Sequence, residues 1–196
     1  MNTFTPKNND ELREAVKLWC INPSDPDYDI NFWLDVFIEY GHISTWNTKN
    51  ITDMSKLFQN CEFNEDISNW DVSNVTNMSC MFMNVENFNQ SLEKWNVSKV
   101  NNMYGMFYGA YDFNSSVNNW NVSNVNNMSF MFSRATSFNQ QLNKWNVSNV
   151  KDMSSMFSYA VKFNQELNSW NVSNVIDMND MFSYAKEFDR PLNNWK

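Results

Sequence analysis

Few side chains in this sequence combine the residue type and the spacing that catalysis requires. His42 is the only histidine, and no serine or cysteine nucleophile in a recognisable motif lies near it. The sequence contains no Cys/His metal-binding set, no glycine-rich phosphate loop and no carboxylate pair at a characteristic spacing. It therefore predicts a protein that is not an enzyme and that uses no metal or other cofactor.

The three cysteines, Cys20, Cys61 and Cys80, are odd in number and irregularly spaced. This pattern argues against a disulfide framework and is typical of a reducing compartment. The first residues also contain no apolar signal core and no lipid-attachment cysteine. We therefore expect an intracellular or virion-associated protein rather than one displayed on a cell surface.

The charge and hydropathy of the chain exclude two classes of partner. The formal net charge is −8 and no basic stripe is present, so nucleic acid is not an expected partner. No segment approaches the roughly 18 apolar residues of a membrane-spanning helix, so we expect no membrane insertion.

A set of polar residues recurs at a fixed spacing and forms the candidate binding face. Two interpretations of this set remain open. Its amide and hydroxyl groups form a flat surface for a protein or a glycan, or the stacked Asn side chains hydrogen-bond to one another. The residues are Asp71, Lys94, Asn96, Ser98, Asn121, Ser123, Lys144, Asn146, Ser148, Asn171 and Ser173.

A second polar column directly follows a recurring phenylalanine. We expect these side chains to be structural and to bond backbone groups at a corner of each repeat. The column consists of Asn64, Asn89, Asn114, Asn139, Asn164 and Asp189.

These polar residues are positioned by an internal repeat. The hexad Trp-Asn-Val-Ser-Asn-Val occurs at Trp120, Trp145 and Trp170, with near-copies at other tryptophans. From Trp70 to Trp195 each of these tryptophans lies 25 residues after the last, whereas the step from Trp46 to Trp70 is 24. A fixed period in this range indicates a protein built from stacked repeats.

The apolar positions predict the structure of one repeat. Trp145 and Val147 have the same strand parity, and apolar residues then recur at steps near three from Met153 to Phe163. The first pattern indicates a short strand, and the second indicates a 3₁₀ or α turn. Stacked coils would form a parallel sheet with a spacing of about 4.8 Å. The expected core includes Trp70, Trp95, Trp120, Trp145, Trp170, Met128, Phe132, Met153 and Phe157.

The segment before the repeats has two helical patterns. Residues 8–20 show one apolar face, with Asn8 and Glu11 as a capping pair. Residues 29–40 are dense in large apolar groups and are followed by Gly41; a helix is expected, with a strand at 32–38 as the alternative. Prolines and aspartates at 23–27 separate the two. We interpret residues 1–42 as a cap over the first repeat.

The repeat resembles the bacterial surface-protein repeat of about 26 residues found in mycoplasma and Listeria-type surface lipoproteins. The resemblance rests on the string Trp-Asn-Val-Ser-Asn-Val-x-x-Met-x-x-Met-Phe-x-x-Ala-x-x-Phe-Asn-Gln-x-Leu and covers Ile43 to Trp195. This family looks like a divergent relative of the BspA-type leucine-rich repeat. The resemblance implies a leucine-rich-repeat-like solenoid with a surface or interaction role.

Together these observations predict an α/β repeat solenoid with short parallel strands on one face, short helical or 3₁₀ turns on the other, and an N-terminal helical cap. Residues 43–196 would form six repeats of 24 or 25 residues and a truncated final strand, within one structural domain.

The expected function is non-catalytic protein binding through the polar sheet face or an open end. The alternatives are a structural component of a larger assembly, such as a virion or surface layer, and a glycan-binding module. The last repeat carries charges and Pro191, which only partly protect its edge, so we expect weak self-association at the C-terminal end.

Overall fold

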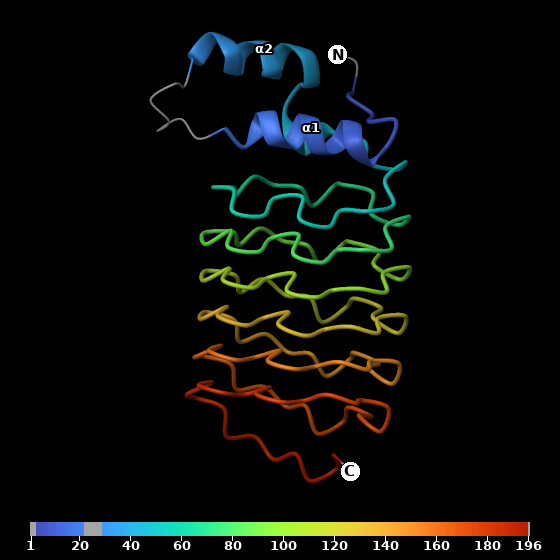
Figure 1. Cartoon of the computed structure of the whole chain (residues 1–196), viewed down its shortest axis with the longest axis vertical. Helices are drawn as coiled ribbons and strands as arrows, with labels where there is room; N and C mark the ends of the chain where they lie inside the picture. The colour runs from blue at the N-terminus through green and yellow to red at the C-terminus, as the bar shows by residue number, and fades with distance from the viewer. Residues whose placement is uncertain (1–2, 22–28, 196) are drawn as a thin grey trace.

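The computed structural model describes residues 3–21 and 29–195. Two α-helices lie at one end of the molecule, and a stack of coils extends from them toward the opposite end (Figure 1). Helix α1 spans Asn9–Trp19, helix α2 spans Ile30–Tyr40, and a short 3₁₀ helix, η1, spans Ile43–Thr45. Each coil corresponds to one sequence repeat, so the order along the chain is also the order along the stack.

Helix α1 begins at a well-formed N-cap. The side-chain oxygen of Asn8 accepts a hydrogen bond of 2.9 Å from the backbone N–H of Glu11, which satisfies one of the free donors of the first turn. Leu12, Ala15 and Val16 are buried and belong to the same apolar core as the coils. The helix expected over residues 8–20 is therefore confirmed.

Helix α2 confirms the helical interpretation of residues 29–40 over the strand alternative. The carboxylate of Asp29 accepts a 2.8 Å hydrogen bond from the backbone N–H of Asn31 at the start of the helix. Gly41 ends the helix with a φ of +67°, a left-handed conformation that costs glycine little. The break expected at residues 23–27 lies outside the described residues.

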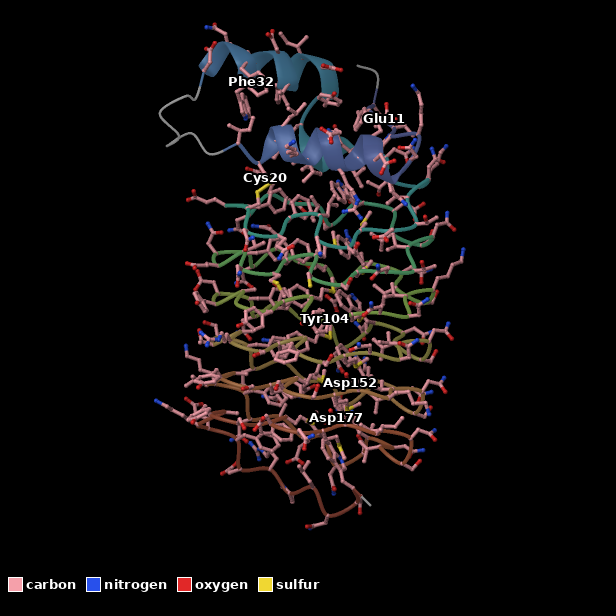
Figure 2. All side chains as sticks on the ribbon, in the orientation of Figure 1. Glu11, Cys20, Phe32, Tyr104, Asp152 and Asp177 are labelled. Atoms are coloured by element: carbon pink, nitrogen blue, oxygen red, sulfur yellow. A yellow bond between two sulfur atoms is a disulfide. The ribbon has the colours of Figure 1, made fainter. Side chains whose placement is uncertain are left out.

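An ion pair and a disulfide attach α1 to the first coil. The guanidinium of Arg13 lies 2.9 Å from Oδ1 of Asp53 and also donates to the carbonyl oxygen of Ser55. Cys20, at the end of the helix, is bonded to Cys61 in the first coil (Figure 2). The helix is thus held to the coil near its middle, through Arg13, and at its C-terminal end, through Cys20.

The cysteine pattern argued against a disulfide framework, but the structure contains one disulfide. Cys20 and Cys61 are joined across a sequence separation of 41, and only Cys80 is free. The spacing looked irregular because this bridge joins the cap to a repeat rather than two equivalent repeat positions. Cys80 is buried in the coil stack, and its burial raises the pKa of its thiol.

The expected fold class is also wrong, because the described residues contain no β-strand and therefore no sheet. Neighbouring coils are joined by single parallel bridges, one for each pair of coils, rather than by runs of paired strand residues. The α/β solenoid with parallel strands, and with it the leucine-rich-repeat-like architecture, is therefore not what this chain forms. The bridging residues are Asp53, Asn77, Asn102, Asn127, Asp152 and Asp177.

The bridging side chains explain why no strand develops. The Oδ1 of Asn127, for example, accepts a 2.9 Å hydrogen bond from the backbone N–H of Ser129, two residues later. Such a bond bends the backbone into a turn and competes with extended pairing. The same bond, 2.7–3.1 Å long, follows every bridging residue.

The expected helical segments after the bridge are turns with a left-handed residue at two positions, four residues apart. In the first coil these residues are Lys56 and Asn60, with φ of 59° and 60°. Side chains normally disfavour this region, so the conformation must be imposed by contacts between coils. The equivalent residues in later coils are Cys80, Asn84, Gly105, Gly109, Phe130, Arg134, Ser155, Tyr159, Asp180 and Tyr184.

A directional hydrogen-bond ladder supplies those contacts. The backbone N–H groups of Met54, Lys56, Phe58 and Asn60 donate to carbonyl oxygens of the second coil at 2.8–2.9 Å. Each later coil repeats this pattern toward the coil that follows it. These four donors of each coil therefore point toward the C-terminal end of the stack, whereas other backbone N–H groups, such as those of Thr76 and Asn101, donate to the preceding coil.

Aromatic columns fill the space inside the ladder. Phe107 and Phe132 stack with ring centroids 5.6 Å apart and planes inclined by 5°. The indole N–H of the buried Trp120 donates to the carbonyl of Leu92 in the preceding coil at 2.9 Å. This bond recurs at 2.9–3.1 Å for Trp70, Trp95, Trp120, Trp145, Trp170 and Trp195. Tryptophan provides this donor, and phenylalanine would not.

The second Asn column has the structural role expected of it. Asn114 Oδ1 accepts a 2.9 Å hydrogen bond from the backbone N–H of Asn139, the equivalent residue of the next coil. The same bond joins every successive pair from Asn64 to Asp189, at 2.9–3.3 Å. The side chains thus satisfy backbone donors at a corner of the stack.

Substitutions at Trp120 should separate its packing from its hydrogen bond. Trp120→Ala should cost about 3–5 kcal/mol because it leaves a cavity in the core. Trp120→Phe keeps most of the ring but removes the indole N–H, so the carbonyl of Leu92 keeps only its bond from the backbone N–H of Trp95; this should cost about 0.5–1.5 kcal/mol. Asn121→Ala should cost less than either. Urea unfolding measures all three, and a larger loss for Asn121→Ala than for Trp120→Ala would reverse the assignment of inside and outside.

The cap junction should lose stability in acid through Asp53. Burial raises the pKa of this carboxyl, but hydrogen bonds from Ser55 and Asn77 and the charge of Arg13 outweigh that effect and lower it below the ordinary 3.8. A depressed folded-state pKa stabilises the protein above the unfolded pKa, and this contribution is lost as the pH falls below about 3.8.

Asp53→Asn is the matched test of this contribution. Asn77, Asn102 and Asn127 make the same turn, so the variant should keep the turn while it removes the charge and one of the two carboxylate oxygens, which accept from Ser55, Arg13 and Asn77. We expect the variant to be less stable by up to about 1 kcal/mol at pH 7, and we expect this difference to be smaller at about pH 3. Thermal melts at both pH values measure the difference, and a gap that does not change with pH would contradict this role for Asp53.

Candidate functional site

The candidate site is the exposed polar surface that we call the Asn face. Its Asp and Asn side chains are exposed in every coil from the second to the sixth, and the serines that follow them are partly or fully exposed. It is a row of turns rather than the face of a sheet. The structure places on it Asp71, Lys94, Asn96, Ser98, Asn121, Ser123, Lys144, Asn146, Ser148, Asn171 and Ser173.

Each Asn of this face closes a turn within its own coil. Oδ1 of Asn121 accepts a 3.2 Å hydrogen bond from the backbone N–H of Ser123, and Asn146 does the same with Ser148 at 3.1 Å. Asn96 and Asn171 make equivalent bonds at 3.2 and 3.1 Å. Within the described residues no hydrogen bond joins one of these Asn side chains to another. The amide oxygen is therefore occupied, and the amide NH₂ remains available on the surface.

The first position of the face carries a charge instead of an amide. Asp71 closes the same turn by accepting from the backbone N–H of Ser73 at 3.0 Å. Hydrogen bonds from the Ser73 hydroxyl and N–H lower the pKa of the Asp71 carboxyl, so it is ionised at neutral pH. Asp71 therefore forms the same backbone turn as the Asn residues of the face. It differs from them in exposing a carboxylate oxygen instead of an amide NH₂.

A neighbouring column fixes the spacing of the face. The Nδ2 groups of Asn124 and Asn149 donate to the carbonyls of Ser98 and Ser123 in the preceding coil, both at 2.7 Å. Asn174 donates to Ser148 at 2.8 Å in the same way. These bonds cross from coil to coil, so the exposed amides are held in a regular row by rigid backbone.

The face is hollowed beside Trp120. A shallow hollow of about 280 Å³ lies there, and most of the residues that line it carry amide or ammonium groups. Nζ of Lys144 donates to Oδ1 of Asn119 at 2.8 Å, and Asn119 donates in turn to Glu93 at 2.7 Å. The lining residues are Asn118, Asn119, Trp120, Asn121, Val122, Lys144 and Asn146.

The sequence analysis missed an exposed aromatic stripe beside the left-handed positions. Tyr104 lies at mid-stack, with its ring 5.8 Å from that of Phe130 (Figure 2). Further along, the guanidinium of Arg134 lies 5.2 Å from the Tyr159 ring, which stacks on Tyr184 at 4.5 Å. These residues occupy positions that vary between repeats, so the period did not reveal them.

The groups that could carry reactive chemistry are His42, which lies between a hydroxyl and a carboxylate, and the separate thiol of Cys80. Nε2 of His42 lies 3.6 Å from a carboxylate oxygen of Glu65, and its Nδ1 lies 2.8 Å from the hydroxyl of Ser44. Cys80 is buried in the coil stack. The described residues contain no cluster of three or more His, Cys, Asp or Glu side chains that could hold a metal ion.

No helix within residues 3–21 and 29–195 is long and apolar enough to cross a membrane. No curated protein and no solved structure matches the sequence. One protein family does match, over residues 33–141 and again over residues 114–196. The two matches overlap and together include every coil of the stack. The chain therefore belongs to the family described as Mycoplasma protein of unknown function, DUF285.

Proposed function

We propose that this protein is a non-catalytic scaffold that binds another protein through the Asn face. The observation that carries the proposal is the turn made by each Asn of the face. The turn uses the amide oxygen and leaves the two amide N–H donors of Asn96, Asn121, Asn146 and Asn171 exposed. Such a row suits a partner that presents carbonyl or carboxylate acceptors.

The hollow beside Trp120 adds a second kind of contact to this row. Lys144 contributes a positive charge there, and the other lining residues include the amides of Asn118, Asn119 and Asn121. Tightly packed interface anchors often occupy small hollows of this kind, surrounded by polar groups. The repeated amides are equivalent in each coil, so they alone would let a partner bind at several positions along the stack. The hollow occurs beside Trp120 and would therefore fix the position of the partner.

The likeness to bacterial surface-protein repeats supports an interaction role. The disulfide provides evidence about the compartment in which the protein works. Disulfides form and persist mainly in oxidising compartments. The Cys20–Cys61 bond therefore favours an extracellular or surface setting over the intracellular one expected from the cysteine count. We propose that the protein works in such a compartment.

A thiol count tests the compartment. Protein purified from its native source, with thiols blocked during lysis and without reductant, should show one modified cysteine per chain, at Cys80, after unfolding. Mass spectrometry of the alkylated chain measures this. Three modified cysteines would show that Cys20 and Cys61 are reduced in the native setting and would contradict the proposed compartment.

Capture experiments with charge-matched variants test the binding face. Asn121→Asp/Asn146→Asp should keep both turns, as Asp71 does, and should remove four amide donors. Proteins captured from a lysate of the native source by the wild type should fall at least about tenfold with this variant, which corresponds to a loss of about 1.4 kcal/mol. Quantitative mass spectrometry of the captured proteins provides the measurement.

Asn101→Asp/Asn126→Asp is the control. These exposed side chains make no hydrogen bond among the described residues, and their replacement adds the same charge away from the Asn face. The control should retain captured proteins within about twofold of the wild type, since surface changes of this kind shift free energies by roughly 0.5 kcal/mol or less. Equal loss in both variants would mean that charge alone weakens capture and that the Asn face is not the site.

A second candidate function is a structural role in a larger assembly. The observation that favours it is the exposure of large apolar side chains at both ends of the molecule. Ile38 on α2 is 79% exposed, and Ile176 in the last coil is 84% exposed. Uncovered apolar ends are typical of units that join end to end.

A further inference from the structure

Two open hollows adjoin where helix α1 meets the first two coils. The first has a volume of about 430 Å³ and the second about 370 Å³, and both lie within the range of small-molecule sites, about 300–1,000 Å³. Asn60 and Cys61 line both hollows, and Cys61 is bonded to Cys20 at the end of α1 (Figure 2). We call the two hollows together the junction groove. It shares no residue with the Asn face.

The first hollow of the junction groove is cationic. It is lined by Arg13 and by the exposed Lys17 and Lys56, and its lining includes no acid. Arg13 is already paired with Asp53, but no ion pair among the described residues includes either lysine. The net charge of the chain is −8, so this local charge is opposite to that of the whole protein. The hollow therefore favours a carboxylate or another anion.

The second hollow has the opposite charge. It is lined by Glu62 and Glu86, both exposed, and its lining includes no cation. Neither carboxylate forms an ion pair among the described residues. This hollow therefore favours an ammonium group. The junction groove thus suits a ligand with a negative charge at one end and a positive charge at the other.

Amide side chains line both hollows. Oδ1 of Asn60 accepts a 2.9 Å hydrogen bond from Nδ2 of Asn84, so the NH₂ of Asn60 remains available as a donor. The side chain of Asn87 is exposed and makes no hydrogen bond among the described residues, so it offers both donors and an acceptor. A peptide group carries one donor and one acceptor and can pair with such side chains.

We propose that the junction groove binds a short peptide with free termini. Its carboxylate lies toward Lys17 and Lys56, and its ammonium group lies toward Glu62 and Glu86. A single amino acid carries both charges on one carbon and therefore reaches only one hollow. A peptide separates them, by up to roughly 10 Å for three residues, because an extended chain spans at most ~3.3–3.6 Å per residue.

Trialanine is the probe, and an NMR titration of the ¹⁵N-labelled full-length chain at low salt is the measurement. Exposed ion pairs are weak and are screened by salt, so the method must detect dissociation constants near about 1 mM. The side-chain amide signals of Asn60 and Asn87 should shift and saturate. Trialanine amide lacks the carboxylate and N-acetyltrialanine lacks the ammonium group, so each should bind about threefold to fivefold more weakly. Alanine should bind at least about threefold more weakly than trialanine.

Variants at each end of the groove assign the two contacts. Lys17→Gln/Lys56→Gln should weaken trialanine by about threefold to fivefold but should bind trialanine amide as the wild type does, since this peptide has no carboxylate to lose a partner. Glu62→Gln/Glu86→Gln should weaken trialanine to the same extent but should leave N-acetyltrialanine unchanged. Arg13 stays in place because it holds Asp53.

Lys151→Gln/Lys162→Gln is the control, since it removes two exposed cations outside the groove and should bind trialanine as the wild type does. Circular dichroism melts confirm that all variants are folded. Three outcomes would overturn the proposal: no shift of the groove amides with trialanine, equal affinity for trialanine and alanine, or equal weakening of trialanine and trialanine amide by the Lys17/Lys56 variant. The first would show that the groove binds no peptide, the second that it holds only a small ion, and the third that the variant acts on the groove itself rather than on a carboxylate contact.

Discussion

The structure depends on a hydrogen-bond ladder that runs in one direction from coil to coil. Four N–H groups of each coil, two residues apart, reach the carbonyls of the next, so the register between coils is fixed by backbone. A single coil could not bury its own apolar side chains, and only its neighbours complete the core. The indole N–H of each Trp donates the other way, to the preceding coil. Each coil is therefore bound to both neighbours by different groups.

Asparagine makes this architecture feasible without strands and with only three glycines. In the bridging column its oxygen closes a turn, as at Asn127; at the corner it satisfies the next coil, as at Asn114; on the surface it closes a turn and exposes donors, as at Asn121. Left-handed residues with side chains cost roughly 1–2 kcal/mol each, which the ladder must offset. The same residue type thus supports the backbone and supplies the candidate site.

The period of the sequence was sufficient to locate the inner columns, because a buried position tolerates few residue types. The structure buries Trp120, Phe132 and Met153 at the positions that the spacing marked as apolar. Both helices were recognisable from their caps and apolar faces. The turns were not, because left-handed positions are usually recognised by glycine. Here only Gly105 and Gly109 stand at such positions within the coils, and residues such as Phe130 and Tyr159 hold the others.

The sequence located the column of surface residues that forms the candidate site. It did not predict the hydrogen-bond partners of their amide groups. Repetition at Asn96, Asn121 and Asn146 marked a surface column, but the sequence could not tell whether the amides bond to each other or to the backbone. That choice depends on whether the following residues turn or extend. Paired strand residues would have stacked the amides, whereas the observed turns draw each oxygen to the N–H two residues later.

The first coil meets a helix rather than another coil, and its contacts there differ from those inside the stack. The bridging column shows this at its first position. Asp53 forms the same turn as Asn77 and Asn102, but its neighbour on the outer side is Arg13 rather than another coil. An amide suffices between coils, where Asn77 donates to Asp53 at 3.3 Å. A carboxylate is favoured where a cation must be held, as Asp53 holds Arg13, but Asp is not confined to the capped end, because Asp152 and Asp177 occupy the same column.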